Sequence, residues 1–316
     1  MENPAASLLA AWAPPLPFAV AYSGGADSTF LLRSAAALWP GQVHALHVHH
    51  GLQTSADAFV AHCGETCRAI DVPLHVEHVD ARHAPGQSPE DAARRARYRT
   101  LAALAQARGL GHVALAQHAD DQVETLLIAL GRGAGVDGLA GMPRTMRRHG
   151  VVFHRPLLDL HVGALRAWLA SQRFGFLEDP SNTDERYTRN RIRHRLLPEL
   201  AEVLPRFRET FARSARNAAR SSTLLADLAT IDLATVGTPP RIAGLQTLTR
   251  ERRANALRYW LRQAHEAVPS EAQLQQLLDQ IDACRTRGHR IRLKVADGFV
   301  EREGELVRWY NFAPSP

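Results

Sequence analysis

The feature that most constrains the fold is a glycine-containing segment, residues 23–28, which lies between a strand pattern and a helix pattern. The apolar run 18–22 before it has the length of a buried strand, and residues 27–38 after it place apolar side chains at helical spacing. A strand therefore ends, two glycines turn the chain, and a helix begins with its unpaired N-terminal amides directed over the turn. These amides and the positive end of the helix dipole favour phosphate, so the segment predicts a phosphate-binding loop.

The residues of this loop also indicate a metal ion. Glycine lets the backbone approach phosphate oxygens closely because it has no Cβ. Asp27 adds a carboxylate beside the anion site, which makes sense if Mg²⁺ lies between the carboxylate and the phosphates. The alternative is an ordinary turn in which Ser23 or Asp27 caps the helix, but the flanking strand and helix favour the phosphate loop. The predicted phosphate-binding residues are Ser23, Gly24, Gly25, Ala26, Asp27 and Ser28.

The first half of the chain alternates strand and helix patterns. This alternation is typical of an α/β domain with a parallel sheet and helices on both faces. In such sheets ligands bind at the carboxyl ends of the strands, where the motifs described below are expected. Further predicted strands are 43–50, 74–79, 112–116 and 151–153, and further predicted helices are 55–70, 89–108 with Ser88 as its N-cap, and 120–130.

The second half differs in composition and pattern. Residues 186–220 contain ten arginines and three acidic residues, which predicts a connecting helical region with a basic face; a solvated helix face would have the same composition. Residues 249–263 and 271–284 have helix patterns, the second with a Ser270/Gln273 capping box. Residues 290–295, 299–302 and 305–310 have the pattern of an antiparallel meander. We predict an α/β domain over residues 1–222 and a smaller α+β domain over residues 223–316.

Size and composition are those of a globular protein. The 316 residues suffice for two domains, and charged residues make up 22% of the chain. The sequence has neither a signal-peptide pattern nor a run of the ~18 apolar residues that span a membrane, so we expect a cytoplasmic protein without a membrane partner. Three cysteines cannot form a disulfide framework. The net charge of +6 permits a polyanionic partner without proving one.

A second constellation, residues 117–125, follows a predicted strand and opens a helix. Asp121 and Glu124 are three residues apart, which places both carboxylates on one helical face. Acidic residues in a first helical turn also stabilise a helix by themselves, but this alternative explains less well a histidine, His118, at the strand end. His118 is suited to contact an α-phosphate, and the two carboxylates are suited to hold an ammonium group or Mg²⁺.

Three more segments are candidates for nucleotide contacts. The glycine-rich segment 131–142, which includes Gly133, is either a flexible connection or a backbone that packs close to a ligand; its position after the acidic helix favours the ligand. His47 and His49 fall on one strand face, where structural or nucleotide-contacting roles are favoured over zinc because a convincing third ligand is missing. Arg94 and Arg97 lie on neighbouring helix faces, suited either to salt bridges or to gripping phosphate.

Taken in order, these motifs resemble those of the bacterial tRNA(Ile)-lysidine synthetases, members of the ATP pyrophosphatase (PP-loop) superfamily. The resemblance covers about residues 20–200, and its most specific part is the series from EDPSN at 178–182 to NRIR at 190–193. The other matching motifs are SGGADS at 23–28, HVHHGL at 47–52, Glu90 with Ala93, Arg94, Arg97 and Tyr98, HADDQ at 118–122 with Glu124 and Thr125, RGAG at 132–135, GLAGM at 138–142 and RPLL at 155–158.

The resemblance implies an adenine-nucleotide α-hydrolase-like (PP-loop) fold and an enzyme that uses ATP and Mg²⁺. It implies that ATP adenylates carbon 2 of the wobble cytidine in a CAU-anticodon tRNA(Ile), after which L-lysine displaces AMP. The residues it implies are Asp27, Arg94, His118, Asp121 and Glu124 for catalysis; the 23–28 loop, His49, Arg97 and Gly133 for ATP; Asp27 and Asp121 for the metal; and Arg189, Arg191 and Arg193 for the RNA backbone or the reacting phosphates.

Other functions stay open at this stage. Longer family members carry an additional C-terminal domain, whereas this chain resembles the short two-domain form. The resemblance therefore does not define how this chain binds the body of the tRNA. A different PP-loop enzyme, such as a tRNA thiolase or an amide-forming synthetase, is one alternative, and a non-catalytic nucleotide-binding module is another. A thiolase requires a catalytic cysteine pair or Fe–S ligands, which Cys63 and Cys67 do not resemble. The sequence does not decide between a monomer and a homodimer.

Overall fold

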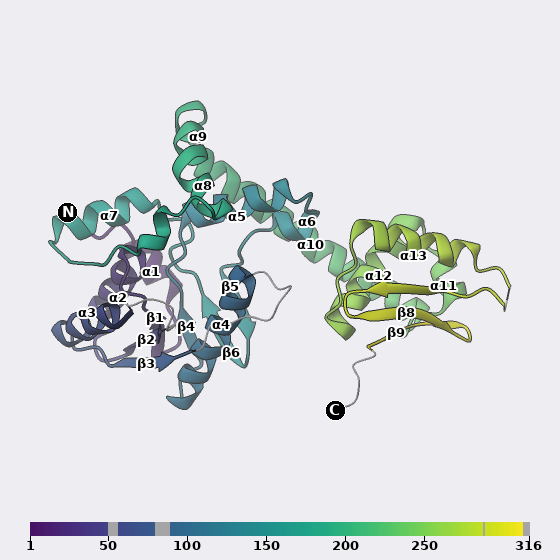
Figure 1. Ribbon diagram of the computed structural model, residues 1–316, viewed down its shortest axis with the longest axis horizontal. Helices are drawn as coiled ribbons and strands as arrows, with labels where there is room; N and C mark the ends of the chain where they lie inside the picture. The colour runs from purple at the N-terminus through teal and green to yellow at the C-terminus, as the bar shows by residue number, and fades with distance from the viewer. Residues whose placement is uncertain (50–55, 80–88, 287, 312–316) are drawn as a thin grey trace. The chain divides into compact units, whose positions relative to one another are not determined.

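The computed structural model describes residues 1–49, 56–79, 89–286 and 288–311, and it divides into two compact units, Met1–Asn217 and Ala218–Pro316 (Figure 1). The boundary between the units falls within the long helix α10 (Phe207–Val236). The predicted domain division after residue 222 falls in the same helix and stays a prediction. The predicted cap at Ser88 and motif residues 50–52 lie outside the described residues.

Unit 1 is built on a six-stranded sheet with the strand order β3-β2-β1-β4-β6-β5. Five of its strands, β3, β2, β1, β4 and β6, run parallel to one another, as predicted. The sixth, β5, pairs antiparallel with β6; it was not predicted, because this edge strand is short, has only one apolar residue, Met146, and exposes half of its residues. The bounds are β1 (Phe18–Ala21), β2 (Val43–His49), β3 (Leu74–His78), β4 (His112–Ala114), β5 (Thr145–Arg148) and β6 (Val151–His154).

Helices cover both faces of this sheet, which confirms the predicted α/β architecture. Phe18 and Val20 of β1 pack in an apolar cluster with four helices on one face, whereas Ala19 packs in a second cluster with α4 on the other face. Burial on both faces explains why β1 is continuously apolar. The helices on the first face are α1 (Ala6–Trp12), α2 (Ala26–Leu38), α3 (Ala56–Ala69) and α7 (Val162–Ser171), and the helix on the second is α4 (Pro89–Ala107).

The strand order reverses at β1, which lies between β2 and β4 and is parallel to both. The loop after β1 contains residues 23–28, and the segment after β4 leads through His118 into α5 (Ala119–Gly131). Ligands of open parallel sheets bind at such a reversal, outside the carboxyl ends of the strands. The fold therefore brings the two strongest sequence motifs to one edge of the sheet.

The basic region that follows α7 forms several short helical pieces. Val123 of α5 packs with Leu197 and Phe207 in a small apolar cluster, so this region lies against the acidic helix, as Figure 1 shows for α5 and α8. The pieces are the 3₁₀-helix η1 (Pro180–Thr183), α8 (Thr188–Arg191), the π-helix η2 (Ile192–Leu196) and α9 (Leu197–Val203). Earlier in the chain, the short helix α6 (Val136–Leu139) lies in the glycine-rich segment.

Unit 2 packs helices against a three-stranded antiparallel sheet, β7-β8-β9, as predicted for an α+β domain. The capping box of α13 is present: the amide of Gln273 donates to the Ser270 hydroxyl at 3.2 Å, and the amide of Ser270 donates to Oε1 of Gln273 at 2.8 Å. No helix in the described part of the chain is long and apolar enough to cross a membrane. The elements are α11 (Ile242–Thr247), α12 (Arg250–His265), α13 (Glu271–Ala283), β7 (Arg292–Val295), β8 (Gly298–Glu303) and β9 (Leu306–Tyr310).

Candidate active site

The loop after β1 forms a cradle at the N-terminus of α2. The N-cap of α2 is Gly25, and no side chain caps the helix, so its first amides are directed to the loop. The Ser28 hydroxyl instead stabilises the loop itself, because it accepts from the Ser23 amide at 3.1 Å and donates to the Gly25 carbonyl at 3.1 Å. Gly24 has a φ of +86°, and a Cβ there would lie 3.1 Å from Sγ of Cys63, so only glycine suits this position.

His118 connects this loop to the first turn of α5. Its Nε2 lies 3.6 Å from Oδ2 of Asp27 and 3.5 Å from Oδ2 of Asp121. Its Nδ1 lies 3.8 Å from Oδ2 of Asp120. Burial lowers the pKa of His118, but the carboxylates of Asp121, Asp27 and Asp120 raise it, and the net result is a pKa of about 9. His118 is therefore a buried imidazolium at neutral pH, and its positive charge lies beside the phosphate loop.

The two carboxylates predicted to hold an amine or a metal hold an arginine in this structure. Nε of Arg193 donates to Oε1 of Glu124 at 2.7 Å, and Nη2 donates to Oε2 of Glu124 and to Oδ1 of Asp121, each at 3.1 Å. The two carboxylates thus lie on one face of α5, as predicted. Glu124 is fully buried, and this burial raises its pKa although the Arg193 charge acts in the opposite direction.

The three arginines predicted to contact RNA have different surroundings. Arg189 donates to the Thr125 hydroxyl at 3.3 Å and lies 3.6 Å from Glu124, so both it and Arg193 are directed to α5. Arg191 is exposed and contacts only its own helix among the hydrogen bonds of the described residues. Residues four apart share a helix face and residues two apart do not, which separates the three side chains. Their assignment to RNA stays a prediction.

Asp120 has a structural role that the sequence did not reveal. Its Oδ1 accepts from Nε of Arg208 at 2.7 Å, and its Oδ2 accepts from the Val162 amide at 3.4 Å. Burial raises the pKa of Asp120, but hydrogen bonding and charge from Arg208 outweigh burial and lower it. Asp120 therefore connects α5 to the first turns of α7 and α10.

Arg155 is a residue of this region to which sequence analysis assigned no individual role. It follows β6 directly and is 4% exposed. Its guanidinium donates to Oε1 of Gln117 at 2.8 Å, to the Pro143 carbonyl at 2.6 Å and to the Tyr98 hydroxyl at 3.0 Å. It thereby joins the segment before His118 to α4 and to the glycine-rich segment. Its position just after a predicted strand, at the same edge of the sheet as the other motifs, is the sequence feature that could have identified Arg155 as part of the site.

The other predicted nucleotide contacts lie on α4 and β2. Arg97 is exposed on α4, and the positive charge of Arg189 lies close enough to act on its pKa. Arg94 precedes Arg97 by about one turn of α4. His49 is buried at the end of β2, with its Nε2 3.4 Å from Oδ1 of Asp57. Arg97 is thus brought near the arginines directed to α5, whereas the nucleotide contacts of Arg94, Arg97 and His49 stay predictions.

The glycine-rich segment is shaped by contacts within the protein. A Cβ at Gly138 would lie 2.5 Å from the Ala134 side chain, and a Cβ at Gly141 would lie 2.8 Å from the Gln122 side chain. Gly133 has a φ of +68° and no atom within 4 Å of a Cβ built there. Its glycine is therefore explained by backbone conformation, while a contact between Gly133 and a nucleotide stays a prediction.

Comparison with known proteins accounts for both units. Residues 5–200 match the PP-loop domain family, and residues 241–311 match the TilS substrate binding domain family. The chain is 60% identical over 289 residues to the tRNA(Ile)-lysidine synthase of Polaromonas naphthalenivorans (strain CJ2), a match that covers 92% of this chain and 88% of the relative. The chain belongs to the tRNA(Ile)-lysidine synthase family.

Two further synthases of this family differ in length. The tRNA(Ile)-lysidine synthase of Bordetella pertussis is 38% identical, and the match covers 96% of this chain and 97% of the relative. That of Burkholderia pseudomallei is 43% identical, and the match covers 93% of this chain but 61% of the relative. This chain therefore spans nearly all of one synthase and about three fifths of the other.

A solved structure shares the PP-loop fold of the synthase family. The U34-tRNA thiolase NcsA from Methanococcus maripaludis, with its [4Fe-4S] cluster, has a TM-score of 0.58 at 12% identity, covering 67% of this chain and 77% of the thiolase. The likeness shows the fold alone. In the present chain Cys63 and Cys67 are buried core residues, and burial raises their pKa values to about 12 and about 11. These thiols are therefore not ionised at neutral pH.

The Asp27 carboxylate fits the Mg²⁺ ion expected at a PP-loop. Its Oδ1 is buried without a hydrogen-bond partner among the described residues, while its Oδ2 lies by His118. A buried carboxylate oxygen without a partner is costly unless a ligand satisfies it. Asp121 fits less well in this structure, because its Oδ2 accepts from the His118 amide at 3.1 Å and its Oδ1 accepts from Arg193.

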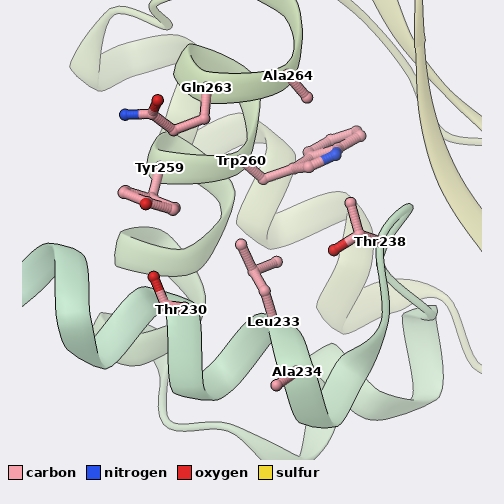
Figure 2. A pocket seen from close by; sticks show the side chains of 8 residues that line it. All are labelled: Thr230, Leu233, Ala234, Thr238, Tyr259, Trp260, Gln263 and Ala264. Carbon is pink, nitrogen blue, oxygen red and sulfur yellow. The ribbon is translucent and has the colours of Figure 1, made fainter.

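A separate cavity of about 510 Å³ lies in unit 2 of this synthase-family chain. Figure 2 shows the rings of Tyr259 and Trp260 and the Leu233 side chain around it. Among the described residues that line this cavity none is acidic or basic, so they offer no charged group for phosphate or amine chemistry. The lining residues are Thr230, Leu233, Ala234, Thr238, Tyr259, Trp260, Gln263 and Ala264.

Proposed function

We propose that this chain joins L-lysine to carbon 2 of the wobble cytidine in a CAU-anticodon tRNA(Ile). In the first step the oxygen on carbon 2 attacks the α-phosphorus of ATP, and pyrophosphate leaves. In the second step the lysine ε-amine attacks carbon 2, and AMP leaves with that oxygen. Family membership supports the reaction. The single structural observation that carries it is the uncapped α2 N-terminus beside Asp27, whose buried Oδ1 is unpaired among the described residues.

The 23–28 loop is proposed to bind the pyrophosphate portion of ATP. The first amides of α2 supply donors and a positive dipole, and the glycine at position 24 keeps the cradle open. Asp27 would hold Mg²⁺ through its unpaired oxygen, and the ion would neutralise phosphate charge. The Asp27 side chain is 39% exposed, so a ligand in the loop can reach it.

His118, Arg94 and Arg97 are proposed to balance the remaining charge of the triphosphate. The raised pKa keeps His118 protonated at neutral pH, and its Nδ1 has no hydrogen-bond partner among the described residues. A fixed cation at this position stabilises negative charge that develops on the phosphates and requires no rearrangement during the reaction. The two arginines of α4 would add donors suited to phosphate.

Asp121 and Glu124 are proposed to hold the lysine substrate, the positioning that the second step requires. Both carboxylates bind the Arg193 guanidinium in this structure, which supports their suitability for a cation. Glu124 is fully buried by this pairing, so a lysine ammonium reaches it only after Arg193 moves away. ATP, L-lysine and tRNA as substrates also make the cytoplasm the proposed location of the reaction.

The proposal is tested by measuring pyrophosphate release from ATP with L-lysine and unmodified CAU-anticodon tRNA(Ile), added separately and together. Mass analysis of the tRNA nucleosides accompanies the assay. We expect release that requires the tRNA, and a cytidine that gains the mass of lysine minus water when lysine is present. Release without tRNA, or tRNA that gains no lysine, would contradict the proposed function.

The thiolase alternative is disfavoured by the surroundings of the cysteines. Cys63 packs under Gly24 with its pKa raised to about 12, and Cys67 is buried one helical turn later. Among the described residues no group of three or more histidine, cysteine or acidic side chains is arranged to hold a metal ion. Neither observation supplies a nucleophilic thiolate.

A further inference from the structure

The helical segment from Tyr187 to Leu196 has two chemically different faces. Arg189 and Arg193, four residues apart, are directed to Thr125 and Glu124 of α5. Tyr187 lies two residues before Arg189, and Arg191 lies two residues after it, so these two side chains lie on another face of the turn. The hydrogen bond from the Arg191 amide to the Tyr187 carbonyl, 3.2 Å, confirms that the two are one helical turn apart.

The outer face presents an aromatic ring and cations to solvent. Tyr187 is 48% exposed and does not cap its helix with a side-chain hydrogen bond. Arg191 is exposed and donates to the Thr188 hydroxyl at 3.0 Å. It forms no ion pair within 4 Å among the described residues, although its charge, after the hydrogen bond and charge of Arg195, helps to lower the pKa of Glu185. Arg195 continues the face four residues later and pairs with Glu185 at the surface, where an ion pair contributes little to stability. These features leave an aromatic and basic surface that the fold of unit 1 does not require.

We infer that Tyr187 and Arg191 form a docking surface for the single-stranded anticodon loop of the tRNA, with the Tyr187 ring stacking on an unpaired base and Arg191 binding an adjacent phosphate. This inference rests on the proposed function and names the part of the RNA that this surface of the enzyme holds. It separates Arg191 from Arg189 and Arg193, which the sequence alone assigns to one RNA-binding set.

The chemistry of the surface fits a nucleic-acid loop. Loop bases are already unstacked, so an exposed aromatic ring can pair with them at low cost, and stacking accepts any base. A guanidinium without a carboxylate partner matches a phosphate better than a neutral or cationic ligand. The outer face is about one helix diameter, ~10 Å, from the inner face that holds the α5 carboxylates. A loop held there therefore presents a neighbouring base close to the carboxylates.

The π-helix η2 supports a functional reading of this segment. It interrupts the regular helix directly after Arg191 and contains Arg193. π-helical turns insert one residue per turn, cost stability and occur mainly at functional sites. Within this turn Arg193 binds Glu124, while Arg195 is exposed and pairs with Glu185.

The test measures binding of a fluorescein-labelled anticodon stem-loop of CAU-anticodon tRNA(Ile) by anisotropy, with the full chain. We expect Tyr187→Ala to weaken binding about tenfold or more, because one stacked base is lost, and Tyr187→Phe to retain it. We expect Arg191→Ala to reduce the slope of log affinity against log salt by about 0.7, and Arg191→Lys to preserve that slope. ATP affinity should stay unchanged in all four variants.

The control is Arg68→Ala, which removes an exposed arginine on α3 that bonds the Gly64 carbonyl of its own helix. Unchanged stem-loop affinity in Tyr187→Ala would overturn the inference, as would an equal loss in Tyr187→Phe, since the ring is then not the contact. An unchanged salt slope in Arg191→Ala would overturn the phosphate contact. If the wild-type chain modifies tRNA(Ile) and the variants bind the stem-loop as tightly as the wild type, this inference fails and the proposed function stands. If the wild-type chain does not modify tRNA(Ile), the proposed function itself fails.

Discussion

The two units bury polar groups in different ways. In unit 2 the buried charged residues are Asp232 and Arg253, and both are satisfied: Asp232 pairs with Arg252, and Arg253 pairs with Asp282 and bonds the Leu245 carbonyl at 2.8 Å. In unit 1 several buried polar atoms have no partner among the described residues, some at the carboxyl edge of the sheet and others, such as Nε1 of Trp12 and Nε of Arg33, on helices α1 and α2. Oδ1 of Asp27 and Nδ1 of His118 are two of these atoms.

The difference between the units indicates where unpaired polar groups are available to bind a ligand. An unsatisfied buried polar group costs free energy, so unpaired groups mark a place where a ligand can satisfy them, whereas the two buried charged residues described in unit 2 are already paired. Unit 1 leaves donors and acceptors free where its strand order reverses, and the remaining apolar clusters must stabilise that arrangement. Variants in the two units should therefore separate loss of activity from loss of stability.

The largest effect is expected from Asp27→Asn. The change removes the carboxylate charge with little change in shape, so pyrophosphate release should fall by about 10²–10³-fold, the range for loss of one transition-state electrostatic contact. The free energy of unfolding should fall only modestly, because Asp27 is partly exposed and the carboxylates of Asp120 and Asp121 still face His118. Asp71→Asn, an exposed change between α3 and β3, is the matched control and should keep full activity. Activity within a few-fold of wild type in Asp27→Asn would remove Asp27 from the reaction.

Glu124→Gln should lower the free energy of unfolding by about 3 kcal/mol, since it leaves Arg193 only partly compensated. Asp121 still pairs with Arg193, which places the effect at the lower end of the range for broken buried pairs. Glu178→Gln is the control: it breaks a pair with Arg166 whose side chains are both half exposed or more, so it should cost under about 1 kcal/mol. Chemical denaturation measures both. Equal costs in the two variants would contradict the buried character of the Glu124 pair.

His118→Gln should change how stability depends on pH. The folded-state pKa of His118, about 9, lies above that of an unfolded histidine, about 6.5. Its contribution is therefore complete below about pH 6.5 and is lost as pH rises through about 9. The wild type should lose on the order of 3 kcal/mol across this window that the variant does not lose. Parallel profiles of thermal stability for the two proteins would show that His118 is not the buried cation of the site.

The smallest effect is expected in unit 2, from Ser270→Ala. Loss of the N-cap of α13 should lower the free energy of unfolding by about 1 kcal/mol. Pyrophosphate release per folded molecule should stay at the wild-type level, because Ser270 lies outside the proposed site. Ser270→Thr keeps a capping hydroxyl and serves as the control. A loss of activity that exceeds the loss of folded protein would mean that unit 2 shapes the reaction site after all.

Much of the architecture could be predicted because strand and helix periods are local. The apolar run of β1, the helix pattern after the phosphate loop and the capping box of α13 each depend on residues close together in sequence. β5 could not be predicted, since an edge strand needs only one buried face and Met146 is its one apolar residue. The division of the basic region into α8, η2 and α9 also escaped prediction, because it depends on packing against α5.

The candidate site could be predicted as a set of residues but not as a set of pairs. Asp27, His118 and Asp121 were expected at one edge of the sheet, and the structure brings them together around one imidazole. Arg193 was expected to face RNA or the reacting phosphates. It instead donates hydrogen bonds to both carboxylates of α5, although it is 69 residues away from Glu124 in the sequence. Arg155 received no role, because its importance comes from three acceptors on three different segments.

The identity of the phosphate loop, the α/β class and the family resemblance followed from short motifs, since backbone geometry and anion binding are set by neighbouring residues. The charge state of His118, the partner of each arginine and the solvent-facing position of Tyr187 were decided only by the tertiary structure. Electrostatic interactions depend on distance and burial, and for residues far apart in the chain both are properties of the folded protein.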